Sequence, residues 1–167
     1  MRHSDSQPTC FASQVRIPPL LLLIGSLAVS RGLKELDPVA RPSAALRIVG
    51  ALLGFGGLSL ALVGVVAFHR QRTTVDPRHP ERAETLVSSG VVYSYTRNPM
   101  YLGFVGTAVG GATWLGSVLA LAGPLALAIY LDRIQIPVEE RALRNRFGTA
   151  YVAYTRSVRR WLGRRAV

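Results

Sequence analysis

Residues 98–131, NPMYLGFVGTAVGGATWLGSVLALAGPLALAIYL, contain no Asp, Glu, Lys or Arg over 34 consecutive positions. As one helix this stretch would be about 51 Å long, well over the ~30 Å thickness of a bilayer's hydrocarbon core. It therefore predicts two membrane helices that fold back on each other as a tight hairpin. Small and aromatic residues mark the expected turn, namely Gly110, Gly111, Trp114, Gly116 and Ser117.

A second apolar run, residues 48–68, has the length that one helical crossing of a bilayer needs. Over the whole chain of 167 residues only 17% are charged, against roughly a quarter in ordinary soluble domains. A soluble core of this size could not bury both runs, so the sequence predicts a compact membrane protein. Small residues four apart, Gly50 with Gly54 and Gly106 with Gly110, predict close helix packing.

The first apolar segment, residues 17–30, begins at Pro18 and Pro19 and could extend to Leu36. It has two interpretations, a retained membrane helix or a cleavable signal peptide ending near Ser30. With the helix retained, the N-terminal tail, the 69–97 loop and the C-terminus together hold 16 of the 20 Lys and Arg residues. The positive-inside rule then places all three in the cytosol.

These observations predict an all-α integral membrane protein that forms a single domain over residues 1–167. We expect a polar tail at 1–16, membrane helices near 17–36, 46–69, 99–115 and 117–136, and a cytosolic C-terminal helical segment. The expected location is a bacterial-type inner (plasma) membrane, with the site and both termini in the cytosol.

Several classes of site are disfavoured by composition. The chain has one cysteine, Cys10, and its three histidines have no metal-ligand spacing, so no metal site is expected. The C-terminal arginines, with Arg156 and Arg160 on one helical face and Arg164 and Arg165 extending the patch, indicate contact with anionic lipid in place of nucleic acid. The oligomeric state is left open.

The entry to the 98–131 run concentrates polar chemistry. Pro99 suits the first position of a helix, and we expect the Asn98 side chain to cap it by accepting a backbone N–H. Arg97 would lie at the headgroups, with Tyr93 and Tyr101 in an aromatic belt. A helix N-terminus here would also attract an anionic group.

The other polar stretch begins at Pro137. Glu140 has a basic residue, Arg144, four positions on, and we expect the two to pair. Glu139 has Leu143 at that spacing, so its carboxylate must find another cation, and a bound cationic cofactor would fit.

These two stretches together resemble the isoprenylcysteine carboxyl methyltransferase and phospholipid methyltransferase family of integral-membrane enzymes. The resemblance covers about residues 69–161. It rests on one motif before the hairpin and one after it: Leu86-Val87, Gly90 and Arg97-Asn98-Pro99-Met100-Tyr101-Leu102-Gly103, then Glu139-Glu140, Leu143, Phe147-Gly148, Tyr151 and Tyr154.

The resemblance implies S-adenosylmethionine as the methyl donor. Carried over by position, the cofactor-binding residues would be Thr85, Leu86, Val87, Tyr93, Asn98, Pro99, Met100, Tyr101 and Glu139. Glu139 and Glu140 would act in catalysis, and we add Arg97, which with Arg133 and Arg141 could orient an anionic acceptor. Asn98 stands where eukaryotic members have His, and Gln135 stands where the prenylcysteine enzymes have an acceptor-binding Arg.

The acceptor expected from the sequence is lipophilic and enters from the membrane, for example a prenylcysteine-like carboxylate or a lipid head group. Neither motif offers a cysteine or histidine nucleophile, so direct transfer is expected. Two other functions remain open: a membrane sterol-type reductase that uses NADPH, whose Arg-His-Pro-Asn-Tyr-Leu-Gly pattern is similar, and a non-enzymatic lipid-binding membrane protein.

Overall fold

The computed structural model describes residues 17–74 and 91–165, and only the backbone of 68–74. Within these ranges the protein is helical, with one isolated bridge between Val158 and Arg164 and no strand. In chain order the elements are α1 (Pro19–Glu35), α2 (Ala44–Thr74), the 3₁₀ turn η1 (Val92–Ser94), α4 (Pro99–Leu115), the 3₁₀ turn η2 (Leu119–Leu121), α5 (Ala122–Tyr130), the π-helical η3 (Leu131–Gln135) and α6 (Ile136–Ser157).

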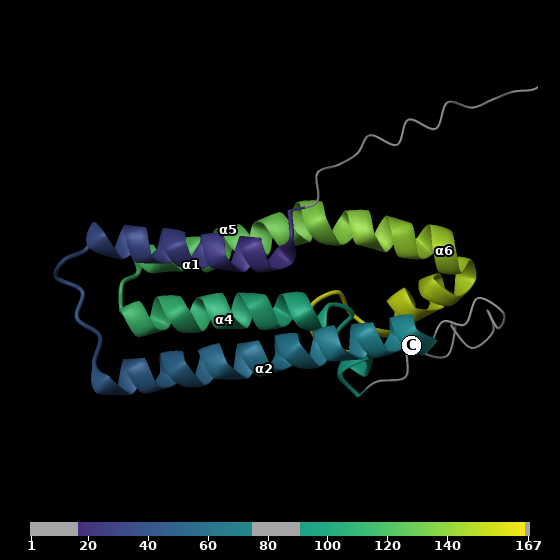
Figure 1. The fold of residues 1–167 in the computed structure, drawn as a ribbon, viewed down its shortest axis with the longest axis horizontal. Coiled ribbons are helices and arrows are strands. Elements are labelled where there is room, and N and C mark those ends of the chain that lie inside the picture. The colour runs from purple at the N-terminus through teal and green to yellow at the C-terminus, as the bar shows by residue number, and fades with distance from the viewer. Residues whose placement is uncertain (1–16, 75–90, 166–167) are drawn as a thin grey trace, which may run out of the picture.

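The helices lie along a common long axis, and α6 extends beyond the bundle at one end (Figure 1). Helix α4 is central, because it packs against α2 on one side and against α1 and α5 on the other. Buried residues of all these helices form one core, which includes Leu23, Ala61, Tyr101, Phe104 and Leu127. The N-terminal end of α4, at Pro99, therefore lies where the core meets the polar residues of α6.

Helices α2 and α4 approach so closely that glycine is required at their contact. A Cβ atom on Gly57 would lie 2.7 Å from the Gly103 carbonyl oxygen, and one on Gly50 would lie 2.6 Å from the Trp114 backbone nitrogen. Of the two predicted pairs, Gly50 and Gly110 lie at the close contact as expected, and a Cβ on Gly106 would lie 3.3 Å from the Gly57 Cα. A Cβ on Gly54 would meet nothing within 4 Å, so glycine is not required there. The contact on α2 recurs every seven residues, at Gly50, Gly57 and Gly64, because the two helices meet along one stripe.

The predicted hairpin is present, and its turn is shorter than the sequence suggested. Helix α4 ends at Leu115, and Gly116 adopts the left-handed conformation (φ 70°) that ends many helices. Ser117 then donates a 2.8 Å hydrogen bond to Asp37, which ties the turn to the α1–α2 connection. Gly110, Gly111 and Trp114 belong to α4 itself and not to the turn.

The second arm of the hairpin does not end near residue 136. Helix α5 passes through η3 directly into α6, which begins at Ile136 with Pro137 in its first turn. A π-helical turn widens the hydrogen-bonding pattern, so the missing N–H of proline is accommodated without a break. The expected C-terminal helical segment is therefore a continuation of the second arm of the hairpin.

Gly148 turns the end of α6 back toward the bundle. Its backbone has φ 53° and ψ −126°, a combination that side-chain-bearing residues rarely adopt. After this bend the helix continues to Ser157, and residues 158–165 return to the start of α4, where the Gly163 N–H donates to the Tyr95 carbonyl at 2.7 Å (Figure 1). The bend thus places the C-terminal segment beside the predicted site.

Two helical stretches are long and apolar enough to cross a bilayer, Ala44–Ala67 and Leu119–Ser157. Helices α1 and α4 have 17 residues each, so the count of four crossings stays a prediction. Helix α1 packs on α4 and α5, and its Ser30 hydroxyl donates a 2.8 Å hydrogen bond to the Ala120 carbonyl.

Candidate active site

The entry to α4 is held by a backbone arrangement that the sequence did not predict. Asn98 precedes the helix, but its side chain makes no capping hydrogen bond. Its Nδ2 instead donates to the Arg160 carbonyl at 3.1 Å, while its backbone N–H donates to Thr96 Oγ1 at 3.1 Å. The cap prediction is wrong because the returning C-terminal segment offers Asn98 an acceptor outside the helix.

Glu139 and Tyr101 join the two predicted motifs. The Tyr101 hydroxyl donates a 2.6 Å hydrogen bond to Glu139 Oε1, and Gln135 Nε2 donates to the same oxygen at 2.8 Å. Tyr101 is only 2% exposed and Gln135 7%. Both donors are neutral, and within the described residues Glu139 has no ion-pair partner. Among the described residues, the charge of this carboxylate is thus stabilised by neutral hydrogen-bond donors and by no cation.

Gln135 is a site residue that the sequence reasoning passed over as a departure from the family pattern. It belongs to η3 and lies four positions before Glu139, a spacing at which helical side chains meet. The four-residue spacing from Glu139 could have identified Gln135 as its partner from the sequence. The π-helical turn keeps Gln135 on the inner face, where its amide also lies 3.4 Å from the Tyr101 hydroxyl.

Glu140 is the centre of an ion-pair network. Its carboxylate lies 3.2 Å from Arg97 Nη1 and accepts two hydrogen bonds from Arg160, from Nε at 3.2 Å and Nη2 at 2.8 Å. The expected partner, Arg144, makes no ion pair with it and is exposed. The i,i+4 prediction is wrong because Glu140 faces the bundle, where the arginines approach from other segments.

Asp132 completes the network from η3. Its Oδ1 accepts hydrogen bonds from Arg160 Nη1 at 3.1 Å and from Trp161 Nε1 at 2.9 Å. The Glu140 carboxylate, and after it Asp132, raise the pKa of Arg160 above its ordinary value, so this guanidinium stays charged at every physiological pH. Asp132 also lies 3.6 Å from the exposed Arg133. Among the inward-facing groups Arg97 and Arg160 balance Glu140 and Asp132, and Glu139 is left without an ion-pair partner among the described residues.

Arg97 is deeply buried for a charged residue, with 9% of its side chain exposed. Its Nη1 reaches Glu140, but its Nε has no hydrogen-bond partner in the part of the chain described. A buried donor of this kind costs free energy unless an acceptor is supplied. The unsatisfied Nε therefore indicates where an anionic or carbonyl group of a bound molecule would be stabilised.

Tyr93 and Tyr154 brace the segment that precedes α4. The Tyr154 hydroxyl donates a 2.7 Å hydrogen bond to the Tyr93 carbonyl, and the Tyr93 hydroxyl reaches the Gly64 carbonyl of α2 at 3.4 Å. Burial raises the pKa of the Tyr93 phenol, so it remains a donor. Tyr93 is thus near the site, but its hydroxyl points at α2.

The predicted site residues divide into three groups. Arg97, Tyr101, Glu139 and Glu140 come together through their side chains, with Pro99 fully buried and Met100 packed against the core at the same helix end. Asn98 and Tyr93 flank them and contact the C-terminal segment and α2. Thr85, Leu86 and Val87 lie outside the described residues.

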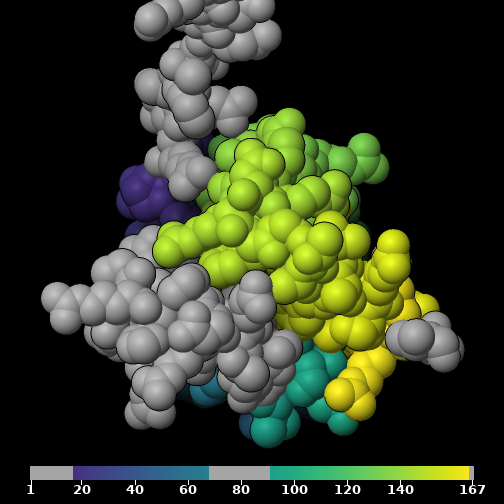
Figure 2. Space-filling model, turned by 90° about the vertical axis from the view of Figure 1, so that its right-hand side faces the viewer, coloured from purple at the N-terminus to yellow at the C-terminus, as the bar shows by residue number. Residues whose placement is uncertain are grey.

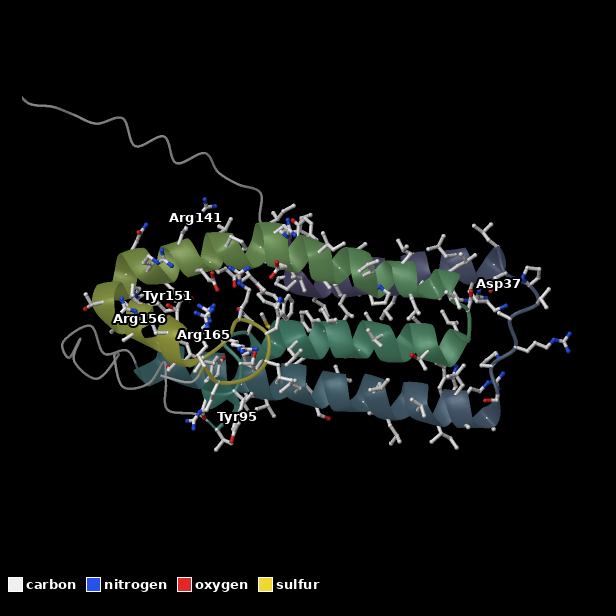
Figure 3. The ribbon with its side chains drawn as sticks, turned by 180° about the vertical axis from the view of Figure 1, so that it is seen from behind. Asp37, Tyr95, Arg141, Tyr151, Arg156 and Arg165 are labelled. Atoms are coloured by element: carbon white, nitrogen blue, oxygen red, sulfur yellow. The ribbon has the colours of Figure 1, made fainter. Side chains whose placement is uncertain are left out.

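Two of the arginines expected to orient an anionic acceptor face outward. Arg133 has 80% of its side chain exposed, and Arg141 lies on the outer side of α6, whereas Tyr151 lies on the inner side (Figure 3). Arg156 is also exposed, so it does not share a face with the inward-facing Arg160. Helix α6 ends at Ser157, so Arg160 is not helical and the four-residue spacing from Arg156 does not put the two side chains on one face.

The comparisons with known proteins agree with the resemblance noted in the sequence. The family model for phospholipid methyltransferases matches residues 46–150, well over half of the chain, and includes α2, α4 and both glutamates. No curated protein and no solved structure gives a significant match. The chain belongs to the phospholipid methyltransferase family, a membrane-associated family whose members transfer methyl groups to lipid-like molecules and generally use S-adenosylmethionine.

Proposed function

We propose that this protein is an integral-membrane enzyme that transfers a methyl group from S-adenosylmethionine to a lipophilic acceptor at the cytosolic membrane surface. The observation that carries the proposal is the Glu139 carboxylate, which accepts hydrogen bonds from Tyr101 and Gln135 and has no ion-pair partner among the described residues. A half-buried carboxylate held only by neutral donors is suited to a cationic ligand.

The described residues fit S-adenosylmethionine at two points. Glu139 would hold its positively charged end, and the unsatisfied Arg97 Nε would donate to its carboxylate. The resemblance adds Thr85, Leu86 and Val87 as further contacts. When bound, this cofactor supplies an activated methyl group on a positively charged sulfur.

The chain's own contribution is positioning. Tyr101 and Gln135 fix the Glu139 carboxylate, and the network around Glu140 fixes Arg97, so the two charged groups are ordered before a ligand arrives. The buried Leu131 and Ile136 beside them keep water away from this region. No cysteine or histidine occurs among the described site residues, which supports direct transfer.

The positions of the arginines change the preferred acceptor. Arg97 is paired with Glu140, and Arg133 and Arg141 face outward, so the described residues offer no free inward-facing arginine for a carboxylate acceptor. An acceptor with an amine or an uncharged reacting group needs no such arginine, so it fits this site better. Methylation of a lipid amine and of a lipid carboxylate with equal acyl chains compares the two directly, and we expect the amine to be preferred.

The outer surface at this end of the molecule supports contact with anionic lipid. Figure 2 looks onto this end, where α6 and the C-terminal segment lie side by side. All three acids between 132 and 165 lie on the inner side, bound to partners there. The exposed side chains there include the arginines Arg133, Arg141, Arg144, Arg146, Arg156, Arg159, Arg164 and Arg165. Such a basic rim beside membrane helices would bind the cytosolic leaflet.

Calorimetric titration of the purified, detergent-solubilised protein with S-adenosylmethionine, and separately with NADPH, tests the proposed function. We expect saturable binding of S-adenosylmethionine and none of NADPH. Binding of NADPH alone would replace the proposal with a reductase, and binding of neither would leave a non-enzymatic membrane protein.

A further inference from the structure

Two side chains of the C-terminal segment after α6 reach the site, that of Trp161 through Asp132 and the charged one of Arg160. Its neighbour Arg159 is exposed. Backbone contacts hold this segment against the entry of α4: the Arg97 N–H donates to the Arg159 carbonyl at 3.2 Å, and Thr96 and Asn98 both donate to the Arg160 carbonyl. These contacts use the main chain, so they do not depend on which side chain stands at position 160.

The Arg160 side chain adds a second layer of contacts. Its planar guanidinium binds both carboxylate oxygens of Glu140 and, on another edge, the Oδ1 atom of Asp132. A two-point contact of this kind restricts a carboxylate in both position and rotation. Arg160 thus holds both oxygens of Glu140, and Arg97 Nη1 lies 3.2 Å from Oε1, the oxygen that also accepts from Arg160 Nε.

We infer that Arg160 is a positioning residue for the cofactor: by clamping Glu140 it holds the Arg97 guanidinium in the orientation that leaves Nε available to a bound anionic group. This inference rests on the proposed function. Without the clamp, Glu140 would be free to rotate and form a two-point pair with Arg97, which would draw Nε away from the ligand. Arg160 itself touches no reacting atom in this scheme.

The test compares Arg160→Gln and Arg160→Lys with the matched control Arg159→Gln, which removes an exposed arginine one position away. The affinity for S-adenosylmethionine is measured by calorimetry. Docking of the C-terminal segment is measured from Trp161 fluorescence in a Trp114→Phe background, since these are the two tryptophans of the chain. Thermal unfolding of each variant reports its stability.

We expect Arg160→Gln to weaken S-adenosylmethionine binding by about tenfold, or about 1.4 kcal/mol, because side chains within one ion-pair network are strongly coupled. Arg160→Lys, which keeps the charge and loses the planar two-point geometry, should show an intermediate loss. The Trp161 emission should stay unshifted in Arg160→Lys, since the main-chain contacts remain. Arg159→Gln should bind as the unaltered protein does.

The double variant Asp132→Asn with Arg160→Gln separates positioning from charge balance. In this variant Arg97 still faces Glu140 and their two charges cancel. The two-point contact of Arg160 with Glu140 is absent. Continued weak binding supports positioning, whereas restored binding overturns it. Equal affinity of Arg160→Gln and Arg159→Gln also overturns it. If the unaltered protein binds no S-adenosylmethionine, the proposed function fails and this inference with it.

Discussion

The hydroxyl of Tyr101 donates a 2.6 Å hydrogen bond to the carboxylate of Glu139, across 38 positions of sequence. This contact joins the first turn of α4 to the first turn of α6. The uncharged run begins in the first of these turns and has ended before the second. It brings the two motifs into one site. The charge of Glu139 is stabilised there by dipoles and not by a cation of the described chain.

Removal of the Glu139 charge should weaken cofactor binding. Glu139→Gln keeps the shape of the side chain, so we expect a loss of roughly tenfold or more in S-adenosylmethionine affinity, because a charge in a water-poor site interacts strongly with an opposite charge. Calorimetric titration measures it. Glu35→Gln, at an exposed pair with Arg31, is the control. Unchanged affinity and turnover in Glu139→Gln would contradict the assignment.

Loss of the Tyr101 hydroxyl should have a smaller effect than loss of the charge. In Tyr101→Phe the Gln135 amide still binds Glu139. We expect a weaker cofactor affinity and a free energy of unfolding lowered by about 1.5–3 kcal/mol, the range for a hydrogen bond to a charged group. Tyr95→Phe, at an exposed tyrosine, serves as the control in the same titration and thermal unfolding. Identical behaviour of the two variants would argue against a role for the hydroxyl.

The α2–α4 contact should tolerate no added methyl group. A Cβ on Gly57 would meet the α4 backbone, whereas one on Gly56 would meet nothing within 4 Å. We expect Gly57→Ala to lower the free energy of unfolding by about 1–3 kcal/mol through overpacking, and Gly56→Ala to leave it nearly unchanged. Thermal unfolding in detergent measures both. The close-packing account fails if the two variants unfold alike.

The bend at Gly148 should depend on its backbone and not on space. A Cβ there would meet nothing within 4 Å, but φ is 53°. Gly148→Ala should therefore lower the free energy of unfolding by about 1–3 kcal/mol, the usual cost of a strained backbone. Gly25→Ala, also in open space but within regular helix, should be neutral or stabilising by up to about 1 kcal/mol. Equal unfolding temperatures would show that the bend persists without glycine.

The helices of this protein were largely predictable because their signals are local. The uncharged run and its proline start predicted a helix over 99–115, and α4 has those bounds. The absence of a base four residues after Glu139 predicted a carboxylate without a helical partner, and none of the described ion pairs involves it. Both features depend on residues within a few positions of one another.

The site's contacts were not predictable in the same way, since they join residues far apart in sequence. Glu140 has a suitable base at i+4, Arg144, yet it binds Arg160 from 20 positions away. Asn98 has the residue type of a helix cap, yet it donates to the returning C-terminal segment. In each case a local rule was overruled because the tertiary arrangement offered a buried partner, and a buried ionic or polar group must be paired.

The sequence by itself determined that the chain is helical and apolar enough for a membrane, where its hairpin lies, and to which family its motifs belong. These properties follow from composition, run length and short spacings. Only the tertiary structure decided which charges pair, because the π-helical turn before Pro137 and the bend at Gly148 rotate α6 and direct the C-terminal segment back to α4. In that arrangement Arg97 and Arg160 pair with Glu140 and Asp132, and Glu139 has no ion-pair partner among the described residues.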